Sequence, residues 1–280
     1  MLSPTNQSFS LKAGETTDGS IKVINPGTSS TNLHYKIQVL PYSVDGENYE
    51  LDLSVETDRT AISKWTQFAN PEGMLAPGQS IDVPFSIVVP ETAPPGGQYA
   101  VIIVSSSPEA NGVTEGTTGV ERIFEVASVL YATVDGQVIR GGQIVSNNIP
   151  FFSTEPKLFT EAVLENTGNV HALARIVLSV KNYFNGETIY AIGGQETDLA
   201  NVIMPDTTRS LKTEVGNLPS PGVLNVEQTV EYLGNTSTIQ KTVFICPVWL
   251  ILVLTLVFCS ILTAIILRVR RRLKKRATDF

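Results

Sequence analysis

The stretch 243–267 contains no charged side chain and is followed directly by a strongly basic C-terminus. As a helix rising about 1.5 Å per residue, this stretch reaches roughly 37 Å, enough to cross a hydrocarbon core of roughly 30 Å. We therefore predict a transmembrane helix over 243–267 and a basic tail over 268–280. The side chains expected to anchor the chain in the membrane lipid are Trp249, Leu254, Phe258, Leu262, Arg268, Arg270, Arg271, Arg272, Lys274, Lys275 and Arg276.

The basic tail also predicts an orientation, because short segments rich in Lys and Arg stay on the cytoplasmic side. We expect a single-pass protein of the cell membrane, with an extracellular N-terminal region and a cytoplasmic C-terminus. The first six residues lack the basic and apolar regions of a signal peptide, so we interpret the start as lying at or near a mature end. The rival is a tail-anchored protein with cytosolic domains, which would move seven basic residues across the bilayer.

Charge and cysteine content exclude some functions for the region before the helix. The chain has 20 basic and 27 acidic residues; the tail holds seven and one of these, which leaves 13 and 26, a net charge near −13. Such an acidic region repels phosphate backbones, so we expect no nucleic-acid partner. Both cysteines, Cys246 and Cys259, lie in the apolar run, and the rest of the chain therefore has neither a disulfide nor a thiol nucleophile.

The region before the helix, 1–242, indicates an all-β fold. Short runs rich in Val, Ile, Tyr and Thr alternate with Gly, Pro and Asn turns, and polar and apolar residues alternate in 33–39. We predict two tandem immunoglobulin-like β-sandwich domains, 1–118 and 119–242, followed by the transmembrane helix. The Gly-containing stretch 106–119 is expected to be either the border or a mobile hairpin, and a strand over 123–134 is expected to open the second domain.

Three landmarks recur in the same order and indicate an internal repeat. Asn25-Pro26-Gly27 corresponds to Asn166-Thr167-Gly168, and Pro77-Gly78 corresponds to Pro205-Asp206. A Pro-Gly pair near 95–96 likewise corresponds to one at 221–222. Each Pro is expected to preset the turn that the next residue completes. The two histidines, His34 and His171, lie at related positions in the two blocks.

The landmarks resemble those of the WxL-interacting surface proteins of Gram-positive and related bacteria, and the resemblance covers the whole chain. The residues that carry it are Trp65, Pro77, Gly78, Pro95, Gly96, Gly97, Tyr99, Asn166, Gly168, Asn169, His171 and Pro205. The resemblance implies a noncatalytic protein whose first domain binds peptidoglycan and WxL-type surface proteins, and whose second domain is associated with host or matrix ligands. The missing signal and the thinner match of the second block depart from the family pattern.

We predict no enzymatic activity, no cofactor and no metal site, and we infer no small-molecule substrate. His34 and His171 lack neighbouring metal ligands in sequence, and no Gly-x-Ser-x-Gly motif is present. The acids between Asp45 and Asp58 are expected to form a hairpin turn and a solvated strand face rather than a calcium loop. The alternatives are a spacer or accessory subunit of a membrane complex and, less favoured, a carbohydrate-processing ectoenzyme.

Two further motifs have alternative interpretations. Leu218-Pro219-Ser220-Pro221-Gly222 is similar to a sortase signal but has Pro221 in place of the Thr that would form the acyl group, so we interpret it as a proline-rich turn. Trp65 could stack on a sugar, but without a neighbouring aromatic residue core or rim packing is favoured.

Overall fold

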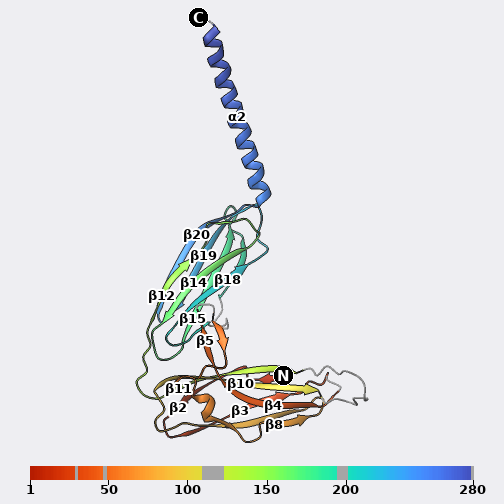
Figure 1. Cartoon of the computed structure of the whole chain (residues 1–280), viewed down its shortest axis with the longest axis vertical. Helices are drawn as coiled ribbons and strands as arrows, with labels where there is room; N and C mark the ends of the chain where they lie inside the picture. The colour runs from red at the N-terminus through yellow and green to blue at the C-terminus, as the bar shows by residue number, and fades with distance from the viewer. Residues whose placement is uncertain (29–30, 47–48, 109–122, 194–200, 279–280) are drawn as a thin grey trace. The chain divides into compact units, whose positions relative to one another are not determined.

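The computed structural model describes residues 1–28, 31–46, 49–108, 123–193 and 201–278, with the side chains of 269 and 271–278 outside this description (Figure 1). The chain divides into two compact units. Unit 1 comprises Met1–Gln143, Glu165–Leu173 and Val202–Arg209, and unit 2 comprises Ile144–Leu164, Ala174–Asn201 and Ser210–Phe280. The predicted class is confirmed, since the fold is built from immunoglobulin-like β-sandwiches followed by one apolar helix.

Two sheets pack face to face in unit 1. The four-stranded sheet has the order β1-β3-β9-β7, with β1 (Leu2–Ser3), β3 (Thr16–Ile24), β9 (Ser80–Val88) and β7 (Thr66–Phe68). The five-stranded sheet has the order β2-β11-β10-β4-β8, with β2 (Asn6–Leu11), β11 (Phe124–Val134), β10 (Gly96–Pro108), β4 (Leu33–Pro41) and β8 (Glu72–Leu75). A hairpin of β5 (Ser43–Asp45) and β6 (Glu50–Asp52) and a short helix, α1 (Ile62–Trp65), complete the unit.

The period-two pattern of the sequence produces the core of unit 1. Along β4, buried Tyr35 and Ile37 alternate with exposed His34, Lys36 and Gln38. Because successive side chains of a strand point to opposite faces, one face of each sheet supplies the core and the other meets solvent. Trp65, predicted to pack in a core or rim, lies in this core with 9% of its surface exposed.

The structure corrects the position of the strand expected over 123–134. Sequence reasoning assigns it to the second domain, but β11 pairs antiparallel with β10 over its whole length, from Gly96↔Val134 to Ser106↔Phe124. It also pairs in parallel with β2, from Val129↔Asn6 to Val134↔Leu11. These two ladders place the strand inside the first sheet. The predicted boundary at 118/119 lies within 109–122, outside the described residues.

The second set of strands forms two further sheets that lie mainly in unit 2, although one end of β12, β14, β15 and β18 and most of β17 belong to unit 1. A three-stranded sheet has the order β12-β14-β18, with β12 (Gly142–Asn148), β14 (Leu158–Asn166) and β18 (Thr207–Val215). A larger sheet has the order β13-β20-β19-β15-β16, with β17 (Asn201–Ile203) paired to β15; its strands are β13 (Phe152–Ser153), β20 (Asn235–Ile245), β19 (Gly222–Tyr232), β15 (Ala172–Asn182) and β16 (Thr188–Ile192). Ile149, Leu158, Val180, Leu224 and Val243 belong to its buried core.

The internal repeat has a hydrogen-bonded counterpart in the structure. The Asn25 side-chain amide donates to the carbonyls of Leu75 and Thr31 at 3.0 and 3.1 Å. The Asn166 amide donates to the carbonyls of Ile203 and Val170, both at 2.9 Å. Each asparagine thus fixes the strand that precedes a Pro turn.

The two Pro turns share one backbone feature. The residue after each proline has a positive φ, 78° at Gly78 and 55° at Asp206. Glycine reaches this conformation at no steric cost, and aspartate tolerates it better than most residues.

The apolar run contains the end of a strand as well as a helix. Val243 and Ile245 close β20 and are 0% and 1% exposed, so they belong to the core of unit 2. The helix α2 (Val248–Thr278) begins after Pro247, later than predicted, because pairing with β19 holds 243–245 extended. Its segment Val248–Arg268 has a mean hydropathy of 3.0 and is long and apolar enough to cross a membrane.

Candidate functional site

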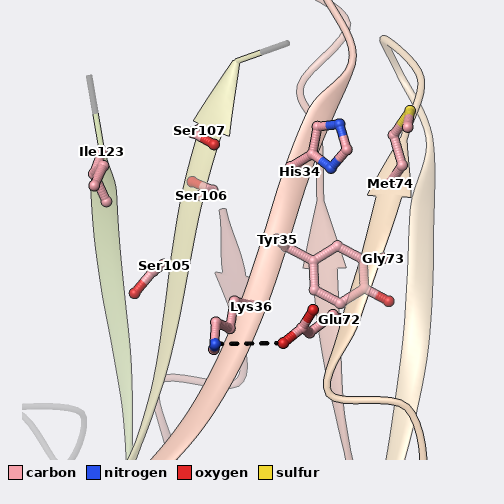
Figure 2. A pocket seen from close by; sticks show the side chains of 10 residues that line it. All are labelled: His34, Tyr35, Lys36, Glu72, Gly73, Met74, Ser105, Ser106, Ser107 and Ile123. Carbon is pink, nitrogen blue, oxygen red and sulfur yellow. Dashed lines mark ion pairs between the residues drawn. The ribbon is translucent and has the colours of Figure 1, made fainter. Parts of the chain in front are cut away.

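A hollow of about 510 Å³ lies over three neighbouring strands of the five-stranded sheet in unit 1 (Figure 2). Strand β4 contributes His34, Tyr35 and Lys36, and the adjoining edge strand β8 contributes Glu72, Gly73 and Met74. Ser105, Ser106 and Ser107 of β10 form the opposite side with Ile123, which precedes β11.

The register of the strands arranges these side chains in two rows. Ser105 pairs with Lys36, which pairs with Glu72, and Ser107 pairs with His34, which pairs with Met74. Lys36 and Glu72 form an ion pair across the strands at 3.4 Å (Figure 2). Both side chains are more than half exposed, so this pair stabilises the fold by less than about 1 kcal/mol. It holds two charges in place at the edge of the sheet.

Gly73 is required for the local packing of β8. A Cβ atom at this position would lie 2.5 Å from the Tyr35 hydroxyl and 2.7 Å from its ring. The Tyr35 ring is 5% exposed and belongs to the core of unit 1. The glycine therefore allows an aromatic side chain to cover the edge strand from the inner side, while Glu72 and Met74 face solvent.

The backbone of β8 has a free edge. The Ile37 amide donates to the Pro71 carbonyl at 2.7 Å, which identifies this pair as a hydrogen-bonded pair of the antiparallel ladder. Such pairs alternate with non-hydrogen-bonded ones, so Gly73 and Leu75 bond to β4 while the N–H and C=O groups of Glu72 and Met74 point away from it. Strand β8 ends the order of its sheet among the described strands.

The chemistry of the hollow is suited to binding. Its ionisable side chains are His34, Tyr35, Lys36 and Glu72, and Lys36 and Glu72 are paired with each other. Within the described residues, no group of three or more His, Cys, Asp or Glu side chains could hold a metal ion. Met74 and Ile123 are 50% and 62% exposed and give the hollow an apolar contact at each side. Polar rows, apolar ends and a free strand edge fit an extended amphipathic polymer.

Several family-motif residues come together elsewhere in unit 1. The Gly97 amide donates to the Asn169 carbonyl at 2.8 Å, and the His171 amide donates to the Tyr99 hydroxyl at 2.8 Å. A Cβ atom at Gly96 would lie 2.7 Å from the Asn169 carbonyl oxygen. The Pro-Gly-Gly-x-Tyr and Asn-x-Gly-Asn-x-His motifs are therefore joined by packing and backbone contacts.

Burial perturbs the ionisable groups of this cluster. Tyr99 is 1% exposed, and burial raises the pKa of its hydroxyl well above the usual range. Burial lowers the pKa of His171, and the nearby Arg140 guanidinium lowers it further. The His171 ring packs against the Tyr99 and Tyr131 rings at 5.7 and 5.1 Å between centroids. His171 is therefore neutral near pH 7, because its pKa is lowered, and it packs among aromatic rings.

The other motif residues occupy turns and the core. Pro77 and Gly78 form the turn beside Asn25, and Pro205 precedes the corresponding turn beside Asn166. Gly168 donates its amide to the Asn166 side-chain oxygen at 2.9 Å. Pro95 is exposed, with its Cβ near Gly136. None of the twelve motif residues lines the hollow over β10, β4 and β8.

The predicted anchor residues lie on α2. Trp249, Leu254, Phe258 and Leu262 are exposed along the helix, as side chains that meet lipid would be, and so are Arg268 and Arg270. The side chains of Arg271, Arg272, Lys274, Lys275 and Arg276 lie outside the described residues.

Sequence reasoning does not identify the hollow. The alternation in 33–39 shows that His34 and Lys36 face outward, but the rows depend on which strands are neighbours. Ser105 and Glu72 are distant in sequence, and only the β10-β4-β8 order brings them to either side of Lys36. The one available signal is that Lys36 in β4 and Glu72 in β8 are both polar residues at outward-facing positions of their strands.

No family model matches the chain, and no curated protein matches it. Among solved structures, a chain of the CsuC–CsuE chaperone–tip adhesion subunit complex from Csu pili of Acinetobacter baumannii is 12% identical, with 88% of this chain and 98% of that chain covered and a TM-score of 0.41. The E. coli chaperone DraB is 13% identical, with 86% and 96% covered and a TM-score of 0.40. A protein of unknown function from Porphyromonas gingivalis W83 is 11% identical, with 88% and 99% covered and a TM-score of 0.31. At these values the likenesses carry no argument about binding.

Proposed function

We propose that the chain is a noncatalytic, membrane-anchored surface protein that binds an extended polymer along the edge strand β8. The observation that carries this proposal is the free edge of β8 beside the hollow. Two outward residues, Glu72 and Met74, offer four backbone groups to a partner strand. Hydrogen bonds to such groups contribute about 0.5–1.5 kcal/mol each, so a short added strand gains affinity from the main chain alone.

Side chains beside the edge would select the partner. In an added strand, alternate residues lie over the face that presents Lys36, His34 and Met74. Met74 and Ile123 offer apolar contact, and the Lys36–Glu72 pair offers both signs of charge. An amphipathic protein segment with alternating apolar and polar residues fits this surface.

The resemblance to WxL-interacting proteins supports particular ligands for this role. It supports WxL-type surface proteins and peptidoglycan as partners of the first domain, and host or matrix ligands for the second. Main-chain recognition at β8 favours a protein over a glycan as the partner of the hollow. In this proposal α2 crosses the cell membrane with the basic tail in the cytoplasm, and the units before it face outward.

A pair of variants at one position tests the binding mode. Met74→Pro removes an outward N–H that β4 does not use, whereas Met74→Ala removes only the side chain. The whole chain in detergent would be incubated with purified peptidoglycan and with solubilised envelope proteins. We expect capture of an envelope protein to be lost in Met74→Pro and weakened in Met74→Ala, with unchanged circular dichroism in both.

Other outcomes would favour the alternatives. Equal capture by wild-type and Met74→Pro protein would exclude strand addition at β8. Capture of neither peptidoglycan nor an envelope protein would favour a spacer or accessory subunit. Turnover of glycans or peptides from a substrate panel would favour an ectoenzyme.

Sidedness is tested separately with protease added to intact cells. We expect cleavage within 1–242 and protection of the tail. Trimming of the tail alone would reverse the proposed orientation.

A further inference from the structure

One end of unit 2 displays a group of aromatic side chains that its core does not use. They are Phe151, Phe152, Tyr183, Phe184 and Phe244, and they are 72%, 39%, 55%, 80% and 47% exposed. Of the aromatic residues before α2 that the structure describes, only Phe124 and Phe159 are exposed to a comparable degree. An isolated exposed ring needs no explanation, but a group at one site indicates an interaction surface.

The strand register places these residues at the same end of the six-stranded sheet. Phe152 of β13 pairs with Phe244 of β20, which pairs with Val223 of β19. The Tyr183 amide donates to the Val223 carbonyl at 3.0 Å, so Tyr183 continues the row beyond β15. At about 4.8 Å between strands, four neighbouring strands span about 15 Å.

The two aromatic residues after β15 are presented by a turn that is held without their rings. The side-chain oxygen of Asn182 accepts a hydrogen bond from the Phe184 amide at 2.9 Å. The backbone carbonyl of Asn182 accepts one from the Gly186 amide at 3.0 Å. The Asn182 amide donates to the Glu187 carbonyl at 2.8 Å. Because these bonds define the turn, the rings of Tyr183 and Phe184 are not needed to hold it.

The aromatic end is tethered close to the apolar helix. Phe244 and Val248 are separated by so short a stretch of chain that its reach is at most about 14 Å. The Cys246 amide donates to the Ser153 carbonyl at 2.9 Å, which holds β13 against the segment that leads into α2. Trp249, the second residue of the helix, is 59% exposed.

We propose that this aromatic end of unit 2 lies in the headgroup layer of the membrane that α2 crosses. The inference rests on the membrane anchorage proposed above and adds a second contact with the same bilayer. Phe, Tyr and Trp side chains combine apolar area with polar edges or groups, and Trp and Tyr are enriched where membrane meets water. The tether to the helix is what identifies lipid, rather than a protein partner, as the occupant.

Charge plays little part in this contact. Lys157, Lys181 and Lys241 lie near the aromatic end, and Lys241 donates to the Ile149 carbonyl at 2.9 Å. Three acids lie near them: Glu155 pairs with Lys157, Glu214 lies near Lys157, and Glu187 lies in the turn that follows Lys181. The local charges balance, so the contact requires no anionic lipid. A vesicle of neutral phosphatidylcholine is therefore the appropriate probe.

Lipid quenching of a fluorophore tests the proposal on the full chain. In a Cys246→Ser, Cys259→Ser background, an NBD fluorophore would be attached through Phe184→Cys or, as the matched control, through Asn235→Cys. Asn235 begins β20 at the opposite end of the same sheet, about 30 Å from Phe244. In liposomes that contain headgroup spin-labelled phosphatidylcholine, we expect loss of most emission at 184 and no loss at 235.

A second variant separates aromatic contact from simple proximity. With the fluorophore at 184, the changes Phe151→Ser, Phe152→Ser and Phe244→Ser are expected to reduce the quenching by more than half. These side chains are exposed, so circular dichroism should not change. Unchanged quenching in this variant would overturn the proposal, because the rings would not make the contact.

The remaining outcomes distinguish this inference from the anchorage itself. If the protein does not float with the liposomes, membrane anchorage fails. If it floats but position 184 is unquenched by lipid and open to iodide, anchorage stands and the aromatic contact is overturned. If position 184 is unquenched by lipid and shielded from iodide, a second copy covers this end instead, which also overturns the lipid contact.

Discussion

Asn25 and Asn166 occupy equivalent positions in the internal repeat, and their side-chain amides make the same two donor contacts. The two sites differ at the side-chain oxygen. That of Asn166 accepts the Gly168 amide at 2.9 Å, whereas that of Asn25 is buried without a hydrogen-bond partner in the part of the chain described. Within the described residues, the motif therefore satisfies the side-chain polar atoms of its asparagine in one copy and leaves the side-chain oxygen unpaired in the other.

The glycine and the histidine of the second copy are also more closely packed than those of the first. A Cβ atom at Gly168 would lie 2.5 Å from the Ile139 carbonyl oxygen, whereas at Gly27 the nearest atom of the described residues would be Gly78 Cα, 4.0 Å away. His171 is partly buried between tyrosine rings, and His34 is exposed beside the hollow. The second copy of the landmark is therefore packed against neighbouring backbone and rings, whereas the first leaves His34 on an exposed strand face.

Replacing each asparagine in turn should give the largest difference in stability between the two copies. We expect Asn166→Ala to lower the free energy of unfolding by about 3–4 kcal/mol, since two carbonyls and one amide lose their partner. Asn25→Ala should cost about 2–3 kcal/mol, because only two carbonyls are affected and an unpaired oxygen is removed. Urea unfolding of the full chain in a non-ionic detergent measures both. Equal losses would show that the Gly168 contact contributes nothing.

The paired glycines sharpen the comparison at a smaller scale. Gly168→Ala should destabilise the protein by about 2 kcal/mol, because its Cβ meets backbone that side-chain rotation cannot move. Gly27→Ala should change stability by less than about 0.5 kcal/mol. The same unfolding assay applies. A large loss for Gly27→Ala would mean that the two turns are packed alike.

The histidines should give the smallest effect, visible as a dependence on pH. The pKa of His171 in the folded chain lies below its usual value of 6.5. As the pH falls toward and below 6.5, His171 therefore binds a proton more readily in the unfolded chain than in the folded chain. Stability should therefore decrease from pH 7.5 to 5.5, and His171→Gln should reduce this decrease. Arg140 is the cation that repels a charged His171, and Tyr99 and Tyr131 stay neutral in this range.

Some features of the hollow follow from local sequence and others do not. The outward position of His34 and Lys36 follows from the alternation in 33–39. Whether the backbone groups of Glu72 and Met74 are free depends on which residues of β8 form the hydrogen-bonded pairs with β4. The sequence of so short a strand does not specify this. Gly73 is explained only by the Tyr35 ring, which belongs to a strand much earlier in the chain.

By itself, the sequence determined the all-β class, the two Pro turns, the recurrence of the Asn-x-Gly landmark and an apolar helix long enough to cross a membrane. These features are local, since side-chain alternation, turn chemistry and hydrophobic length act within a few residues. Tertiary structure decided that Phe124–Val134 joins the first sheet, that Val243–Ile245 ends a strand, and that one histidine is half-buried and the other exposed. Each of these depends on which distant strand supplies hydrogen bonds or covers a side chain, and period-two patterning specifies a buried face without specifying the partner.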